Sequence, residues 1–330
     1  MKKSKLNTPV ALIIFNRPEY TFKVFEVIAK ARPAKLLITS DGPRPHRLGE
    51  AEKVDLARSI VSMVDWDCEV LTNFSSINRG CKYGPAKGID WVFEQVEEAI
   101  ILEDDCLPSL SFFRFCQELL DFYREDRRIA MIAGSNLLGG SFDGITESYF
   151  FSRHTYCWGW ATWRDRWVGT FDVEMKNWPI YRDTDLFDRI HGSKKRAASW
   201  RIGFDYLYQN KMDAWDYQWL YSNWLLNRLT IVPSRNLVSN IGFGAEATHT
   251  FNSKDRLSNV PRVDIDFPLI HQRHVMCNEI ADRALYKRVF GPRPIDYVKN
   301  AWVDFKQFLK KLPAGEFLAK FLREKNAKKR

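Results

Sequence analysis

The sequence is poor in paired cysteines, long apolar runs and glycine-rich phosphate loops, and each of these shortages excludes a class of protein or site. The 330-residue chain has six cysteines, with no C-x-x-C pair and no spacing typical of a zinc site. Scattered cysteines favour reduced thiols and a cytoplasmic protein. The first apolar run, near Val10, is too short for a signal-peptide core or a membrane span.

Positive charge is concentrated near the end of the chain. Ten basic and three acidic residues lie between Lys299 and Arg330, which leaves only +2 of the total charge of +9 on the other 298 residues. A nearly neutral body argues against a nucleic-acid partner. Residues 276–330 are expected to form a basic amphipathic helical tail. Its basic face beside Trp302 and Phe305 suits adsorption to an anionic membrane surface, and the alternative is a helical hairpin that packs on the body.

Continuous aliphatic runs alternate with helical patterns, which is typical of α/β proteins with a mostly parallel sheet. Strands are expected at 9–15, 35–40, 68–72, 99–102, 129–133 and 230–233. Helices are expected at 21–31, 50–64, 86–97, 112–124, 183–190, 200–210 and 213–227. We therefore expect a Rossmann-like first half (1–135), an α+β second half (136–275) and the tail.

Three carboxylates, Glu103, Asp104 and Asp105, directly follow the strand predicted at 99–102, and Pro108 is expected to stop that strand from pairing further. Open α/β sheets bind ligands at the carboxyl ends of their strands. Like charges at such an edge repel, and a divalent cation carrying a nucleotide diphosphate would relieve the repulsion. The alternative is a solvated acidic turn.

Further polar residues follow the other predicted strands. Asn16, Arg17 and Asp41 end the first two strands, where an Arg can stack on a nucleotide base and an Asp can accept from its N–H. An Asp-Gly-Pro turn is the simpler explanation for Asp41. Arg79, in Asn-Arg-Gly with Lys82 nearby, precedes a helix whose backbone amides could hold phosphate or ribose. The alternative, favoured for Lys82, is a solvated basic turn.

A carboxylate flanked by indoles suits a general base, because desolvation raises its pKa. Asp216 follows Trp215 in this way, near the start of a predicted helix, and Asp213 fits the role of that helix's N-terminal cap. Upstream, Trp158, Trp160 and Trp163 can either stack on sugars or fill the core.

A loop further along carries two glycines and a histidine. Gly242 and Gly244 would allow a phosphate to approach the backbone, and His249 could bind a metal or the diphosphate. A lone histidine is more often structural.

Taken in order, these motifs resemble the GT-A nucleotide-sugar glycosyltransferases. The nearest pattern is the inverting N-acetylglucosaminyltransferase I family and its bacterial relatives, which are often labelled HlpA-like nucleotide-diphospho-sugar transferases. Ile-Ile-Leu-Glu-Asp-Asp at 100–105 resembles the metal motif, and Trp215-Asp216 resembles the pair that supplies the base. Gly159-Trp160 resembles the acceptor-side segment, and Phe243-Gly244 with His249 resembles the loop over the diphosphate. The likeness spans about 9–249.

The resemblance implies a GT-A fold and an inverting transfer. Asp105, with His249 as a candidate second ligand, would bind Mn²⁺ or Mg²⁺, and Asp216 would deprotonate the acceptor hydroxyl. The donor contacts would come from Asn16, Arg17, Asp41, Arg79, Glu103, Asp104, Gly244 and His249. The acceptor contacts would come from Trp158, Trp160, Trp163 and Trp215.

The chain departs from the family pattern at two places. Thr248 stands where the family has Ser, and Tyr217-Gln218 follow Asp216 where it has a second Asp, so Asp213 stays an alternative base.

The implied partners are a nucleotide-diphosphate sugar, with UDP-GlcNAc the first to test, and a surface-glycan or lipid-linked acceptor at the inner face of the cytoplasmic membrane. Two other functions stay open. A nucleotidyltransferase would be expected to carry a glycine-rich loop after the first strand, where this chain has Asn-Arg-Pro-Glu at 16–19. A non-catalytic sugar-binding module would keep the aromatic surface and bind no nucleotide with metal.

Overall fold

The computed structural model describes residues 6–138, 145–244 and 255–289. Residues up to Asp282 belong to one compact unit, and a second unit begins at Arg283. The predicted boundaries at 135 and 275 stay predictions, but one sheet runs through both predicted halves. Most of the predicted tail, including Trp302 and Phe305, lies outside the described residues.

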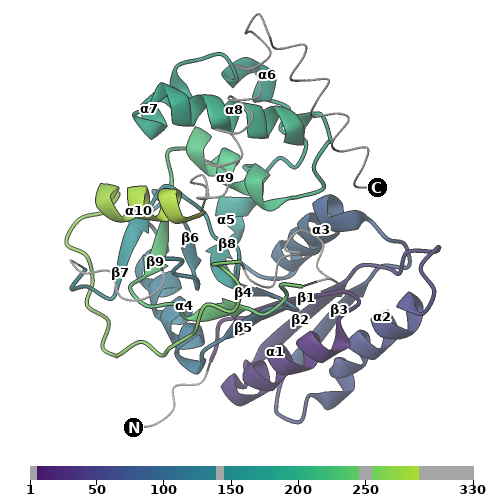
Figure 1. Ribbon diagram of the computed structural model, residues 1–330. Coiled ribbons are helices and arrows are strands. Elements are labelled where there is room, and N and C mark those ends of the chain that lie inside the picture. Colours follow the sequence, from purple (N-terminus) through teal and green to yellow (C-terminus); the bar gives the residue numbers. More distant parts are fainter. Residues whose placement is uncertain (1–5, 139–144, 245–254, 290–330) are drawn as a thin grey trace, which may run out of the picture. The chain divides into compact units, whose positions relative to one another are not determined.

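The main sheet is mixed and mostly parallel, with strand order β3-β2-β1-β4-β8-β6-β9-β7 (Figure 1). Its strands are β1 (Val10–Ile14), β2 (Lys35–Ser40), β3 (Glu69–Phe74), β4 (Glu98–Glu103), β6 (Ile129–Ala133), β7 (Tyr149–Ser152), β8 (Trp160–Trp163) and β9 (Leu229–Pro233). Strands β1 to β4 are mutually parallel, and β8 runs antiparallel between β4 and β6. The α/β class with a mostly parallel sheet is therefore confirmed.

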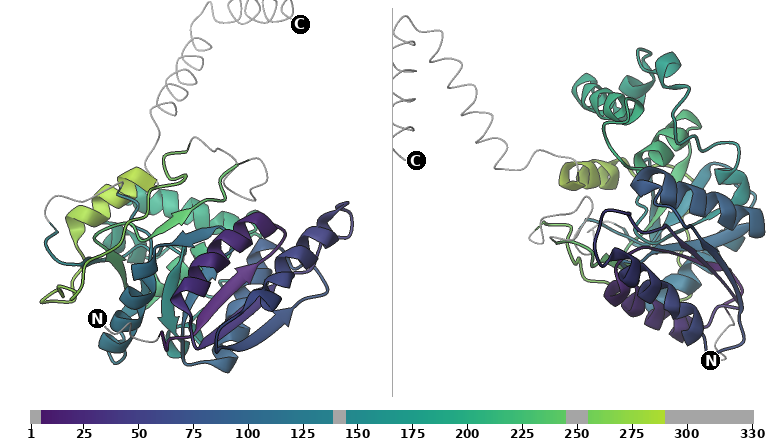
Figure 2. Two further views of the ribbon diagram at one scale, coloured as in Figure 1. Left: turned by 90° about the horizontal axis from the view of Figure 1, so that it is seen from below. Right: turned by 90° about the vertical axis from the view of Figure 1, so that its right-hand side faces the viewer.

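Helices cover both faces of the first four strands. The helices are α1 (Pro18–Ala31), α2 (Glu50–Arg58), α3 (Gly80–Gln95), α4 (Leu110–Phe122), α5 (Arg164–Trp167), α6 (Trp178–Tyr181), α7 (Leu186–His191), α8 (Lys194–Tyr208), α9 (Asp216–Leu225) and α10 (Glu279–Val289), with a 3-10 turn at Ser59–Met63. Helices α1 and α2 lie on one face of β1–β3, and α3 lies on the other (Figures 1 and 2). The aliphatic residues of β1, β2 and β4 are buried between these layers, apart from the partly buried Ile13.

A second, two-stranded sheet lies beside the end of β4. Strand β5 (Cys106–Pro108) pairs antiparallel with β10 (Val238–Asn240), so Asn240 faces Cys106. The expectation that Pro108 ends strand pairing is wrong, because β4 already stops at Glu103 and Pro108 pairs with Val238 in the new sheet. This small sheet brings a segment more than a hundred residues downstream against the acidic cluster.

Helices α6 to α9 form a largely aromatic group in the second half (Figure 1). Trp178 packs between Phe187 and Phe204, with ring centroids 5.5 and 5.4 Å away. No helix in the described ranges is both long and apolar enough to span a membrane.

Candidate active site

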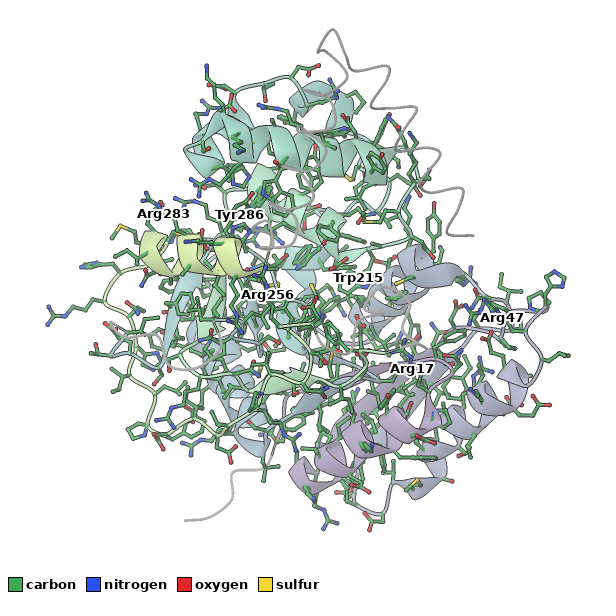
Figure 3. The ribbon with its side chains drawn as sticks, in the orientation of Figure 1. Arg17, Arg47, Trp215, Arg256, Arg283 and Tyr286 are labelled. Atoms are coloured by element: carbon green, nitrogen blue, oxygen red, sulfur yellow. The ribbon has the colours of Figure 1, made fainter. Side chains whose placement is uncertain are left out.

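The parallel register of β1 and β4 brings two acidic residues next to the chain that follows β1. Ile13 pairs with Glu103, so residues after Ile14 lie beside Asp104 and Asp105. The backbone N–H of Phe15 donates to Asp104 Oδ2 at 3.1 Å, and Arg17 Nη1 donates to Asp105 Oδ2 at 2.9 Å. The predicted meeting of Arg17 with the acidic cluster at one sheet edge is confirmed. Figure 3 labels Arg17 and Trp215.

The other side of Asp105 is closed by the segment after β10. Asn240 Nδ2 donates to Asp105 Oδ1 at 3.5 Å, and the Ile241 N–H donates to the Asp105 carbonyl at 2.9 Å. A Cβ at Gly242 would lie 2.0 Å from Asp105 Oδ2, so only glycine fits against this carboxylate. Sequence reasoning missed Asn240, because its partner lies 135 positions upstream and no local pattern marks it.

Burial raises the pKa of all three acids, and repulsion between carboxylates adds to the rise at Glu103 and Asp104. Desolvation is the largest cause for each, and the charge of Asp105 adds to it at Glu103 and Asp104. The pKa of Asp104 rises to about 7, while the guanidinium of Arg17 opposes the rise at all three acids. The ionised forms of these acids are therefore destabilised despite Arg17, and a cation bound beside them would favour ionisation.

Asp216, the first residue of α9, lies close enough to the cluster to act on it electrostatically. Its charge raises the pKa of Glu103 and of the Cys157 thiol, after desolvation and, at Glu103, after the charges of Asp105 and Asp104. At Cys81, near the start of α3, desolvation again leads, followed by the charges of Glu103, Asp216, Asp213 and Asp105. Carboxylates from the end of β4 and from the start of α9 thus act electrostatically on one thiol.

Asp41 and Arg79 line a polar pocket of about 290 Å³ at the ends of β2 and β3. The carboxylate of Asp41 is hydrogen-bonded within the protein. Its carboxylate accepts the backbone N–H groups of Arg79 at 2.8 Å and Gly80 at 3.1 Å. Desolvation outweighs these bonds and raises the pKa of Asp41. The pocket is also lined by Thr39, Ser40, Asn73, Phe74, Ser75, Ser76, Gly84, Lys87 and Gly88.

Asp213 does not cap its own helix, which is a correction to the sequence analysis. Helix α9 begins at Asp216, with Trp215 in the N-cap position. The carboxylate of Asp213 instead accepts the backbone N–H groups of Cys81 at 3.0 Å and Lys82 at 2.6 Å, at the start of α3. The Lys82 ammonium donates to Glu174 Oε2 at 2.9 Å and to Asn210 Oδ1 at 2.7 Å.

Other predicted residues lie in less direct positions. Asn16 donates to Glu50 Oε1 at 2.9 Å, and Arg44 pairs with the same Glu50, whose pKa these bonds lower against desolvation. Gly244 is the last residue of a described range and has a positive φ of 154°, a conformation that residues with a side chain rarely adopt. His249 lies outside the described residues.

The tryptophans separate into core and edge positions. Trp160 and Trp163 are fully buried in β8, so they fill the core and do not offer a surface for sugars. Trp215 is also buried and stacks on Trp160, with centroids 5.9 Å apart and rings at 30°. Trp158 is only partly buried, and its ring meets Phe243 edge-on at 5.7 Å. Of these four tryptophans, Trp158 alone has a partly exposed ring that a ligand could contact.

The acidic cluster at the end of β4 offers carboxylate oxygens to a divalent cation. Within the described ranges, no three His, Cys, Asp or Glu side chains are arranged to hold a metal ion. Mg²⁺ in nucleotide sites is usually held by one or two carboxylates plus substrate phosphates. The carboxylate of Asp105, now paired with Arg17 at 2.9 Å, would be such a ligand where a diphosphate supplied the remaining oxygens.

The protein is an α/β protein with a mixed sheet, whose carboxyl edge has an acidic cluster at the end of β4 and a polar pocket at the ends of β2 and β3. Models of known protein families do not match the chain, and a search of curated proteins finds no significant match.

Proposed function

We propose that the protein is a metal-dependent, inverting glycosyltransferase of the GT-A type that uses a nucleotide-diphosphate sugar. One observation carries the proposal. Beyond desolvation and the charges of Asp105 and Asp104, the charge of Asp216 raises the pKa of Glu103 at the end of β4, and a polar pocket lined by Asp41 and Arg79 lies at the ends of β2 and β3 in the same sheet. A sheet edge of this kind is where α/β proteins bind nucleotides.

The donor would lie along this edge. Asp41, Arg79, Asn16 and Arg17 would bind and orient the nucleoside, with the pocket of about 290 Å³ taking part of it. Asp105 would hold a divalent cation, Mn²⁺ or Mg²⁺, together with diphosphate oxygens. When bound, the cation supplies positive charge that stabilises the leaving nucleotide diphosphate.

Asp216 would act as the general base. It would accept the proton of an acceptor hydroxyl, whose oxygen attacks the anomeric carbon from the side opposite the diphosphate. One displacement inverts the anomeric centre. Trp158, at the partly exposed edge, would contact the acceptor, which we place among surface or lipid-linked glycans at the inner face of the membrane.

Two measurements test this function. UDP would be titrated with and without Mn²⁺, and a panel of nucleotide sugars starting with UDP-GlcNAc would be scored for metal-dependent hydrolysis and transfer. We expect Asp105→Asn to weaken metal-dependent UDP binding about tenfold or more. Asp216→Asn should keep that binding and lower turnover by a factor of about 10² to 10⁴, the usual contribution of a general base.

The matched control is Asp67→Asn, an exposed carboxylate before β3. It should behave like the wild type in both measurements. Metal-independent UDP binding would favour a nucleotide-binding protein of another kind, and no UDP binding would favour the sugar-binding module. Full activity in both Asp105→Asn and Asp216→Asn would refute the assigned roles.

A further inference from the structure

The first turn of α3 is held by two carboxylates from segments that are far apart in the sequence. Asp41, after β2, accepts the N–H groups of Arg79 and Gly80. Asp213, before α9, accepts those of Cys81 and Lys82 at 3.0 and 2.6 Å. Arg79 occupies the N-cap position but makes no capping bond with its side chain. The start of α3 therefore takes its caps from two other elements.

Lys82 adds a second connection to the segment that precedes α9. Its buried ammonium donates to Asn210 Oδ1 at 2.7 Å and pairs with Glu174 at 2.9 Å. Asn210 and Asp213 are separated by only three positions, so the loop between α8 and α9 is attached to α3 at two points. Gly80 also packs closely on Asp213, because a Cβ there would lie 3.1 Å from its Oδ2.

This attached loop ends at the proposed base. Asp213 precedes Asp216 by three residues, a reach of at most about 10 Å, so a shift of one moves the other. Trp215, directly before Asp216, is buried and stacks on Trp160. Asp216 thus begins α9 directly after a segment that is anchored by a carboxylate and by an indole.

We infer that Asp213 is a positioning residue: by capping α3, it fixes Asp216 opposite the acidic end of β4. This inference rests on the proposed function for the role of Asp216, but the capping itself does not. It also decides between the two candidate bases, because the carboxylate of Asp213 is already committed to two backbone donors. Charge-assisted bonds to backbone N–H groups stabilise the ionised form and its place.

Hydrogen exchange tests the capping without any activity assay. In Asp213→Ala, the amides of Cys81 and Lys82 should exchange at least about tenfold faster, because they lose their acceptor. Asp216→Asn, three residues away, is the matched control and should leave them protected. Asp213→Asn keeps one acceptor oxygen and should fall between, and it serves if the alanine variant does not fold. Unchanged exchange in Asp213→Ala would overturn the inference.

Kinetics test the positioning. Asp213→Ala should lower kcat about tenfold to a hundredfold, the cost of a small misplacement of a catalytic group, with KM for the donor changed much less. The fall in kcat at low pH, the acidic limb of the pH profile, should persist in Asp213→Ala. Asp213→Asn should recover part of the lost kcat. If Asp213→Asn instead removed turnover and that limb as fully as Asp216→Asn, Asp213 would be the base. No transfer by the wild type would refute the proposed function, and exchange would still decide the capping.

Discussion

At the scale of the residue, the acidic cluster shows what a sequence can and cannot specify. The three acids after an aliphatic strand were visible in the sequence, and so was the guanidinium at the end of the first strand. The close contact of Gly242 with Asp105 was not, because it depends on the pairing of β5 with β10 across the chain. The capping role of Asp213 was hidden for the same reason.

The pKa of Asp104 makes stability depend on pH. Because it is about 7 in the folded protein and near 3.8 in the unfolded chain, the folded state binds more protons between these values. We therefore expect the free energy of unfolding to fall as pH rises from about 4 to about 7 through this group. Asp104→Asn should flatten that fall, as measured by urea denaturation across this range.

Asp126→Asn provides the contrast for this experiment. The hydrogen bond from Arg128 lowers the pKa of Asp126, so its stabilisation is present at neutral pH and is lost as pH falls through that lowered pKa. This variant should lose stability at neutral pH and leave the fall between about 4 and 7 in place. An unchanged slope in Asp104→Asn would show that other groups carry it.

At the scale of the element, strands made of continuous aliphatic residues were predicted well. Strands β2 and β6 have the expected bounds, and β1, β4 and β9 differ from the prediction by one residue at one end or both. The strands that were missed are β5, β7, β8 and β10, which are three or four residues long and give no periodic signal. Helix α3 starts six residues before its predicted start, because Gly84 and Pro85 suggest a break and its caps lie in distant segments.

The tryptophan-rich strand β8 gives a test at this scale. Trp163 is fully buried, and its indole packs under the guanidinium of Arg166 at 4.5 Å. Trp163→Ala should lower the free energy of unfolding by about 3–5 kcal/mol, because it leaves a large cavity. Trp158→Ala removes a partly exposed ring and should cost much less. Equal losses in urea denaturation would contradict the division into core and edge.

At the scale of the whole molecule, the expected membrane contact falls on the basic tail, most of which lies outside the described residues. A chain ending after Asn300 should bind vesicles of anionic phospholipid at least about tenfold more weakly than the full chain, since each cation near such a surface contributes about 1 kcal/mol. Sedimentation with neutral vesicles is the control and should show weak binding by both. Unchanged binding to anionic vesicles would remove the membrane from the proposal.

The place of β8 also governs the order in which the molecule can be completed during synthesis. Strand β4 pairs with β1 on one side and with β8 on the other, and β6 pairs only with β8 and β9 among the described residues. A nascent chain that has reached residue 135 therefore presents β4 as an open edge and leaves β6 without neighbours. Open edges invite pairing with other chains, so the middle of the sheet stays exposed to misassembly until residues near 163 leave the ribosome.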